Sequence, residues 1–282
     1  MPKKQMNVTT LAVALKHFDR SRAAGLHYSN SVAQPLGSDG VFRLDDGRRV
    51  FGLGSGTLAP RADIDPDRIV PIPDALDDAT AAALPNAVIG SAMALLCKAG
   101  IQPGDVVLVN GATGFTGRVA VQLAKHYGAA QVIAAGRTPR TLKDADEFLQ
   151  TTDPAFASRA KTADPDIVLD YLWGPTAEAI LTALTGDGRF TKRRRYVSIG
   201  SVTGDKIALS AATLRSTDLQ LTGSGLGAWS KAQVQRLFAD ILPEAFDLAA
   251  SGQLQVATTT IALADLSTAG DPPPGVRVVV TL

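Results

Sequence analysis

The chain has 282 residues, and its 28 lysines and arginines nearly balance its 27 aspartates and glutamates, for a formal net charge of +1. This length suits two domains better than one. The balance argues against nucleic acid or a membrane surface as the main partner, because both favour proteins with a cationic excess.

The first 75 residues predict a mostly antiparallel β domain. Three short apolar segments, 41–44, 49–53 and 68–72, alternate with turns rich in glycine and aspartate, a pattern typical of β structure. The uncharged, Ala-rich run 79–97 follows. Because it lacks a dense content of Leu, Ile and Phe, we expect a buried helix between two domains rather than a membrane span.

From residue 79 onward, predicted helices alternate with short buried strands. The run 106–109 is continuously apolar and bounded by turn residues, and a helix is predicted over 116–127. Further strands are expected at 132–135, 167–169, 196–199 and 219–222, and further helices near 175–184 and 230–250. A short strand is also expected at 276–282, which locally belongs to neither this pattern nor that of the β domain. Strands separated by helices predict a parallel, doubly wound α/β sheet.

A glycine-rich turn joins the first of these strands to its helix. Gly111, Gly114 and Gly117 have GxxGxxG spacing there. Such glycines allow a tight turn, a close approach of backbone to a pyrophosphate, and close packing of helix on sheet. Unpaired N–H groups and the helix dipole then favour the anion. We therefore predict a dinucleotide site, the alternative being a turn that only packs a helix closely.

The end of the next strand predicts which dinucleotide is bound. An acidic residue usually follows this strand and contacts the NAD ribose, but Gly136 and Arg137 stand there, with Arg140 just beyond. Arginine offers paired donors to a 2′-phosphate. The sequence predicts NADPH rather than NADH, with a solvated arginine pair as the alternative.

The single cysteine, Cys97, forms no internal disulfide and supplies no Cys-rich zinc site, which predicts a reduced, cytoplasmic protein. With only three histidines in the chain, no metal site is expected. The basic N-terminal start precedes an apolar stretch, 11–15, that is too short for a signal peptide.

The motifs together resemble the zinc-independent quinone oxidoreductases of the medium-chain dehydrogenase/reductase superfamily. The resemblance is carried by PLGSDGVFRLDDGRRVFGLG from residue 35, DDATAAALPNAVIGSA from 77, IQPGDVVLVNGATGFTG from 101, DIVLDYLWGP from 166, RYVSIG from 195 and LTGSGLG from 221. A short-chain dehydrogenase is a competing interpretation of GATGFTG. That class requires a Tyr-x-x-x-Lys motif, which this sequence lacks.

The resemblance implies a Rossmann doubly wound parallel sheet plus a shortened GroES-like β domain. The catalytic domain would begin with 1–88, the NADP-binding Rossmann domain would cover 89–251, and 252–282 would return to the catalytic domain. In the N-terminal stretch, Lys16 stands where the family has an asparagine. An alternative register places His27 at that asparagine.

Site residues follow from the same resemblance. The loop expected to hold the pyrophosphate consists of Gly111, Ala112, Thr113, Gly114, Phe115, Thr116 and Gly117. The other expected cofactor contacts are Ser91, Arg137, Arg140, Leu172, Trp173, Ser198, Gly200, Gly223, Ser224 and Gly225. The candidate proton donors are Tyr28 and Tyr171, each with a structural role as its alternative. The basic run 192–195 predicts a solvated loop, or a surface that attracts the cofactor.

The implied activity is hydride transfer from NADPH to a quinone or an α,β-unsaturated carbonyl. Either acceptor is already electrophilic, so a positioned hydride donor and a few hydrogen-bond donors suffice without a metal. The alternative is a non-catalytic NADPH-binding sensor or regulatory module. A homodimer is compatible with the resemblance.

Overall fold

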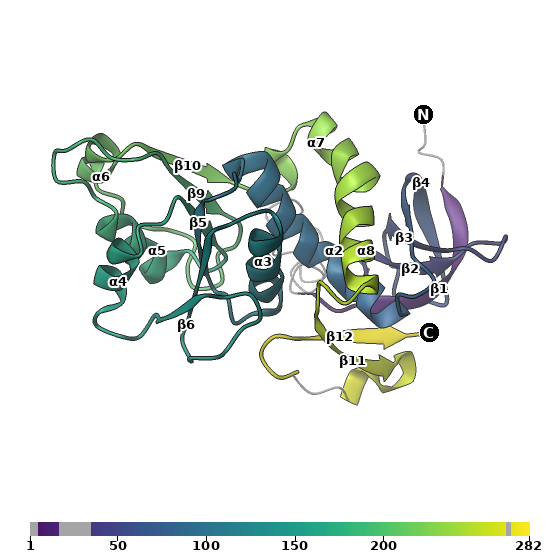
Figure 1. Cartoon of the computed structure of the whole chain (residues 1–282). Coiled ribbons are helices and arrows are strands. Elements are labelled where there is room, and N and C mark those ends of the chain that lie inside the picture. The colour runs from purple at the N-terminus through teal and green to yellow at the C-terminus, as the bar shows by residue number, and fades with distance from the viewer. Residues whose placement is uncertain (1–4, 17–34, 269–271) are drawn as a thin grey trace. The chain divides into compact units, whose positions relative to one another are not determined.

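The computed structural model describes residues 5–16, 35–268 and 272–282. The described chain forms two compact units (Figure 1). One comprises the chain up to Asn86 together with Gln235–Leu282, and the other is Ala87–Val234. The sequence analysis placed these two changes of domain after residues 88 and 251.

The first unit is built on a six-stranded sheet in the order β11-β12-β1-β2-β3-β4. Strand β1 also pairs with β4, so the β1–β4 ribbon closes on itself. All pairs are antiparallel except β11 with β12. The strands are β1 (Met6–Ala14), β2 (Asp39–Arg43), β3 (Arg49–Gly54), β4 (Arg61–Pro71), β11 (Ala257–Ala262) and β12 (Val276–Thr281).

Alternating apolar side chains fill the centre of this first unit. Val8, Phe42 and Ile64 are buried in one cluster, as the two-residue period of a half-buried strand requires. The chain returns to this unit within α7 (Lys231–Arg236), which continues into η3 (Leu237–Ile241) and α8 (Leu242–Ala250). Phe246 of α8 packs edge-on against Phe51. A short helix, η4, covers Leu263–Thr268.

The second unit contains the predicted doubly wound sheet, which is confirmed. Its strands are parallel throughout and lie in the order β10-β9-β8-β5-β6-β7. The chain starts at the central β5, moves outward to β6 and β7, and then returns to β8 and continues to β9 and β10. The strands are β5 (Val106–Asn110), β6 (Gln131–Gly136), β7 (Glu147–Gln150), β8 (Ile167–Asp170), β9 (Arg194–Ser198) and β10 (Leu219–Gly223).

Helices cover this sheet. Phe156 and Ala160 of α4 and Ile180 of α5 share a core cluster with Leu108 and Ile133 of the sheet. Because right-handed crossovers run in opposite directions from the centre of the sheet, α3 lies on the other face. The helices are α3 (Phe115–His126), α4 (Phe156–Thr162), α5 (Gly174–Ala183), α6 (Ala211–Ser216) and the short η2 (Leu226–Ala228).

Helix α2 (Asp78–Ala92) continues into the π-helical η1 (Met93–Ala99). Together they form the one helix in the described part of the chain that is long and apolar enough to cross a membrane by length and composition. Of its most apolar window, 67% is buried inside the protein. Core helices of globular proteins show the same burial.

Candidate functional site

The carboxyl ends of the parallel strands bring the predicted site residues together. The strand register aligns Ala135, Asn110, Asp170, Ser198 and Gly223 in one row across β6, β5, β8, β9 and β10. The segments predicted to bind the cofactor start at this row or directly after it. Ligands of open parallel sheets bind at this edge, so the second unit presents one candidate site.

The glycine loop is closed tightly against this edge. The N–H groups of Gly111 and Ala112 both donate to the carbonyl oxygen of Ala135, at 3.0 and 2.9 Å. Gly111 has φ +94°, in the left-handed region that favours glycine. A Cβ at Gly117 would contact the carbonyl oxygen of Gly111 and lie 2.7 Å from the Cα of Ala112. Larger residues at both positions are therefore excluded by the backbone itself.

The first turn of α3 has no side-chain cap. Gly114 is its N-cap and provides no side-chain hydrogen bond, and the first N–H to bond within the helix is that of Arg118, to Gly114 at 3.0 Å. The helix dipole adds a partial positive charge at the same place. A phosphate group fits this donor set.

Arg118 was missed by the sequence analysis and adds a positive charge near that of Arg140. Its Nε donates to the carbonyl oxygen of Thr113 at 3.2 Å, which holds the half-buried guanidinium on the glycine loop. Burial and the neighbouring positive charge of Arg140 lower the pKa of Arg118. Arg137 and Arg140 are exposed. The sequence signal that could have identified Arg118 is its position directly after Gly117, the third glycine of the loop.

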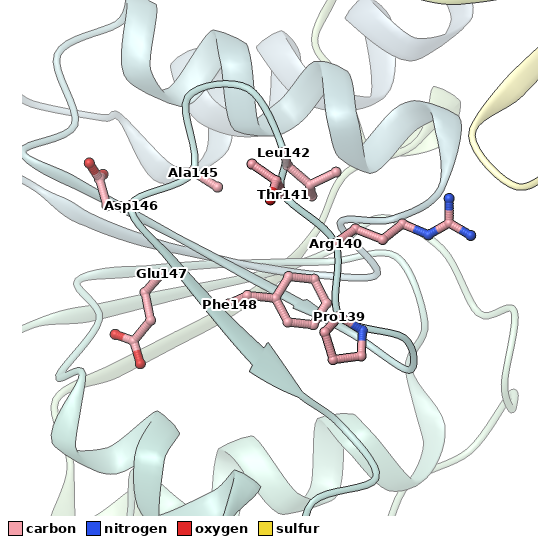
Figure 2. Close-up of a pocket in the computed structure, with 8 residues that line it drawn as sticks. All are labelled: Pro139, Arg140, Thr141, Leu142, Ala145, Asp146, Glu147 and Phe148. Atoms are coloured by element: carbon pink, nitrogen blue, oxygen red, sulfur yellow. The ribbon is translucent and has the colours of Figure 1, made fainter.

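A cavity of about 440 Å³ lies beside Arg140, where a connection without a helix joins β6 to β7 (Figure 2). Its lining includes Leu142 and the ring of Phe148, and Arg140 extends at the opposite end from Asp146 and Glu147. Those carboxylates are paired, Asp146 with Lys125 and Glu147 with Arg159. The positive end of the cavity is thus Arg140, whose charge acts on Arg118 beside the glycine loop.

Ser91 and Tyr171 meet beneath the start of α3. Ser91 is fully buried, its Oγ lies 2.9 Å from the hydroxyl of Tyr171, and it donates to the carbonyl oxygen of Thr116 at 3.4 Å. Burial raises the pKa of Tyr171 above its ordinary value of 10.0. The phenol therefore stays protonated in the physiological range. Tyr28, the other candidate proton donor, lies outside the described residues, as does His27.

The remaining predicted contacts surround the same edge. Leu172 and Trp173 are half-buried directly after β8, and the N–H of Gly200 donates to the carbonyl oxygen of Asp170 at 3.2 Å. Ser224 is buried, and its N–H donates to the carbonyl oxygen of Ser198 at 2.8 Å. Gly223 and Gly225 flank it along the chain.

Asn110 and Asp170, two fully buried polar residues in this row, were also missed by the sequence analysis. The Asn110 amide nitrogen donates to Asp170 Oδ1 at 2.8 Å and to the hydroxyl oxygen of Thr176 at 2.9 Å. The sequence signal available for them was their position, because each is a polar residue at the end of a predicted apolar strand, 106–109 or 167–169.

The basic run 192–195 lies at the opposite edge of the sheet. Its side chains other than Arg193 form ion pairs of 2.6–3.1 Å with Asp105, Asp164 and Asp166. Asp105 and Asp166 directly precede β5 and β8, so these pairs lie at the amino ends of the strands. Residues 192 and 193 thus precede β9 as the expected loop, but three of the four side chains are paired with carboxylates.

Lys16 is buried in the first unit, where its Nζ forms an ion pair with the carboxylate of Asp39. The backbone carbonyl of Asp39 accepts a hydrogen bond of 2.7 Å from the hydroxyl of Thr57.

Within the described residues, no three His, Cys, Asp or Glu side chains cluster as metal ligands do.

Comparison with known proteins gives relatives of two kinds. No protein-family model matches the sequence. The chain is 37% identical over 159 residues to the polyketide synthase GfsB of Streptomyces halstedii, which covers 54% of the chain but 3% of that protein. It spans 3–12% of the length of the polyketide synthases it first matches. It is 28% identical to the probable NADPH-dependent quinone reductase tdiC of Emericella nidulans, over 83% of the chain and 81% of tdiC.

Solved structures share the fold over the whole chain. The quinone oxidoreductase of Thermus thermophilus, determined also in complex with NADPH, has a TM-score of 0.79 at 24% identity and is covered over 94% of its length. The CurK enoyl reductase has a TM-score of 0.74 at 22% identity, over 100% of this chain and 93% of CurK.

Proposed function

Because the chain has the fold of the quinone oxidoreductases and enoyl reductases of the medium-chain dehydrogenase/reductase superfamily, we propose that it is an NADPH-dependent, zinc-free oxidoreductase. These structures confirm the fold that the resemblance implied. The acceptor we propose is a quinone or an α,β-unsaturated carbonyl, since tdiC is named a quinone reductase and CurK an enoyl reductase. One cysteine and three histidines in the sequence support a reaction without zinc.

The observation that carries the proposal is the fit of the glycine loop to a pyrophosphate. A side chain at Gly117 would collide with the loop backbone, and the first turn of α3 has no side-chain cap. Both features are those of a helix N-terminus that binds a phosphate group through its backbone N–H groups. We assign the pyrophosphate to residues 111–117 and the 2′-phosphate to Arg118, Arg137 and Arg140, because paired guanidinium donors match phosphate geometry.

NADPH, when bound, supplies a hydride to the electrophilic carbon of the acceptor. The chain's own part is to hold the reactants and to manage one proton. Leu172 and Trp173 follow β8 at the carboxyl edge, where we assign them to the nicotinamide side of the site, and Ser91 to its ribose or phosphate. We assign the remaining contacts with the cofactor to Ser198, Gly200 and the turn 223–225.

A proton must reach the acceptor after hydride addition, at the carbonyl-adjacent carbon of an enone or at an oxygen of a quinone. Tyr28 and Tyr171 remain the proposed donors beside water. A general acid works best when its pKa lies near the working pH, whereas burial raises that of Tyr171 further above neutrality. The contact of the Tyr171 hydroxyl with Ser91 also supports a role in positioning the Ser91 side chain. A cytoplasmic location and a homodimer belong to the same proposal.

The proposal is tested by measuring affinity and turnover together. We expect tighter binding of NADPH than of NADH, and loss of this preference in Arg137→Ala. Equal affinities for the two cofactors in both proteins would overturn the NADPH assignment. Consumption of NADPH with a panel of quinones and enones then tests the reaction. Tight binding without turnover of any acceptor would favour the sensor or regulatory module instead.

A further inference from the structure

Asp170, the last residue of β8, carries a fully buried carboxylate that accepts hydrogen bonds from four groups. Oδ2 accepts from the hydroxyl of Tyr196 at 2.8 Å, and Oδ1 from the side-chain amide of Asn110 at 2.8 Å. The backbone N–H groups of Leu172 and Trp173 also donate to Oδ1, at 2.9 and 3.1 Å. Burial and the Asp170 carboxylate raise the pKa of Tyr196 well above its ordinary value, so this phenol remains a donor.

The turn whose N–H groups donate two of these bonds is strained. Trp173 has φ 59° and ψ −156°, a region that is essentially restricted to glycine. Such a conformation persists only where the surroundings fix it from several sides. The hydroxyl of Thr203 donates to the carbonyl oxygens of Leu172 and Trp173, both at 3.0 Å. The indole packs edge-on against the ring of Tyr196, with centroids 6.4 Å apart.

The strained turn lies against the glycine loop. A Cβ built on Gly111 would be 3.1 Å from the side chain of Leu172, so Leu172 occupies the space that the glycine leaves. Asn110, directly before Gly111, is tied to the same carboxylate. Asp170 therefore joins the turn after β8 to the start of the loop after β5.

We propose that Asp170 is a positioning residue of the cofactor site: its carboxylate holds the turn 172–174 in its strained form and so fixes Leu172 against the phosphate-binding loop. This inference rests on the proposed function, because it takes the glycine loop to bind NADPH. Backbone strain of this kind concentrates at ligand sites, where it preorganises the groups that bind.

The same strand offers a matched control. Asp166, at the amino end of β8, also accepts a backbone hydrogen bond, from the N–H of Val106 at 2.8 Å, and pairs with Lys192. Removing this carboxylate weakens the fold at the opposite edge of the sheet. If the role of Asp170 were purely structural, Asp166→Ala and Asp170→Ala would change the NADPH Kd to the same extent.

The test compares the NADPH Kd and amide hydrogen exchange of the ligand-free protein in three variants. Asp170→Ala is expected to raise the Kd about tenfold or more, which corresponds to ~1.4 kcal/mol per factor of ten, and to speed exchange at Leu172 and Trp173. Asp170→Asn is expected to keep most of the NADPH affinity and most of the slow amide exchange of the turn, because its amide oxygen can accept the same backbone bonds. Asp166→Ala is expected to leave the Kd unchanged.

If Asp170→Ala does not fold, Thr203→Val provides a second test at an exposed site, since it removes the two side-chain bonds that hold the turn from its other side and leaves the backbone bond from Thr203 N–H to Leu172 in place. We expect faster exchange at the turn and a Kd raised about threefold. An unchanged Kd in a folded Asp170→Ala, or in Thr203→Val with the turn released, would overturn the inference. Failure of the wild-type protein to bind NADPH would instead overturn the proposed function.

Discussion

The Nε of Arg118 donates to the carbonyl oxygen of Thr113 over 3.2 Å, so the first turn of α3 folds a positive charge back onto the glycine loop. Burial lowers the pKa of this guanidinium, and the positive charge of Arg140, from the connection after β6, lowers it further. Like charges repel, and an anion with two or more negative oxygens relieves that repulsion.

This pair predicts cofactor selectivity. Arg118→Ala and Arg140→Ala are each expected to raise the Kd for NADPH about tenfold and to leave the Kd for NADH nearly unchanged, because only NADPH carries the 2′-phosphate. Titration of both cofactors measures the effect. Arg193→Ala is the control, since Arg193 belongs to the run at the other edge of the sheet. Equal losses for NADPH and NADH would contradict the assignment.

Gly117→Ala is expected to destabilise the second unit by about 1–3 kcal/mol and to weaken NADPH binding, because overpacking forces the backbone to shift. The added Cβ would meet the carbonyl oxygen of Gly111 and the Cα of Ala112. Gly227→Ala is the matched control, since a Cβ there meets nothing within 4 Å. Thermal denaturation and cofactor titration compare the two, and similar behaviour of both variants would refute the close packing of the loop.

Tyr171→Phe separates positioning from proton donation. The variant removes the hydroxyl that Ser91 contacts at 2.9 Å. Because burial raises the pKa of Tyr171, we expect a Kd for NADPH raised several-fold and a kcat lowered by less than about tenfold. The pH–rate profile of the wild type should show no ionisation from this phenol below about pH 10. A kcat reduced by about a hundredfold or more at unchanged Kd would identify Tyr171 as the proton donor.

Acid stability tests the Lys125–Asp146 pair. The hydrogen bond from Lys125, at 2.8 Å, lowers the pKa of Asp146 below its ordinary 3.8. A depressed carboxyl pKa stabilises the fold above the unfolded value, and this contribution is lost as pH falls through the folded value. The stability difference between wild type and Lys125→Met should therefore be present at neutral pH and be lost as the pH falls below 3.8 and through the lowered pKa of Asp146.

Lys143→Met is the control for this measurement. The Nζ of Lys143 lies 4.0 Å from the carboxylate of Asp144, which is beyond hydrogen-bond distance, whereas Lys125 and Asp146 are 2.8 Å apart. Denaturant unfolding at a series of pH values gives both differences. A Lys125→Met effect that persists undiminished at the lowest pH would show that the packing of the lysine, and not its charge, is responsible.

Much of the second unit was predictable because its signals are local. Buried parallel strands appear as short apolar runs, and the expected strand at 106–109 and helix at 116–127 lie within a residue of β5 and α3. Strand β7 and helix α4 escaped prediction because Glu147–Gln150 and Phe156–Thr162 are short and mixed in polarity. Their positions depend on packing against the rest of the sheet.

The candidate site was predictable only where a residue type carries its own signal. Glycine spacing identified 111–117, and an arginine after a strand identified Arg137. Asp170 and Asn110 act through partners that lie 60 residues apart along the chain, and only the strand register brings them together. The ion pairs of the run 192–195 depend in the same way on carboxylates distant in sequence.

The most direct test of the central claim is the loss of nicotinamide absorbance when purified protein, NADPH and each member of a panel of quinones and enones are mixed. The account predicts acceptor-dependent oxidation of NADPH that is saturable in both reactants, with NADH a poorer donor. Tight binding of NADPH with no oxidation by any acceptor would contradict it.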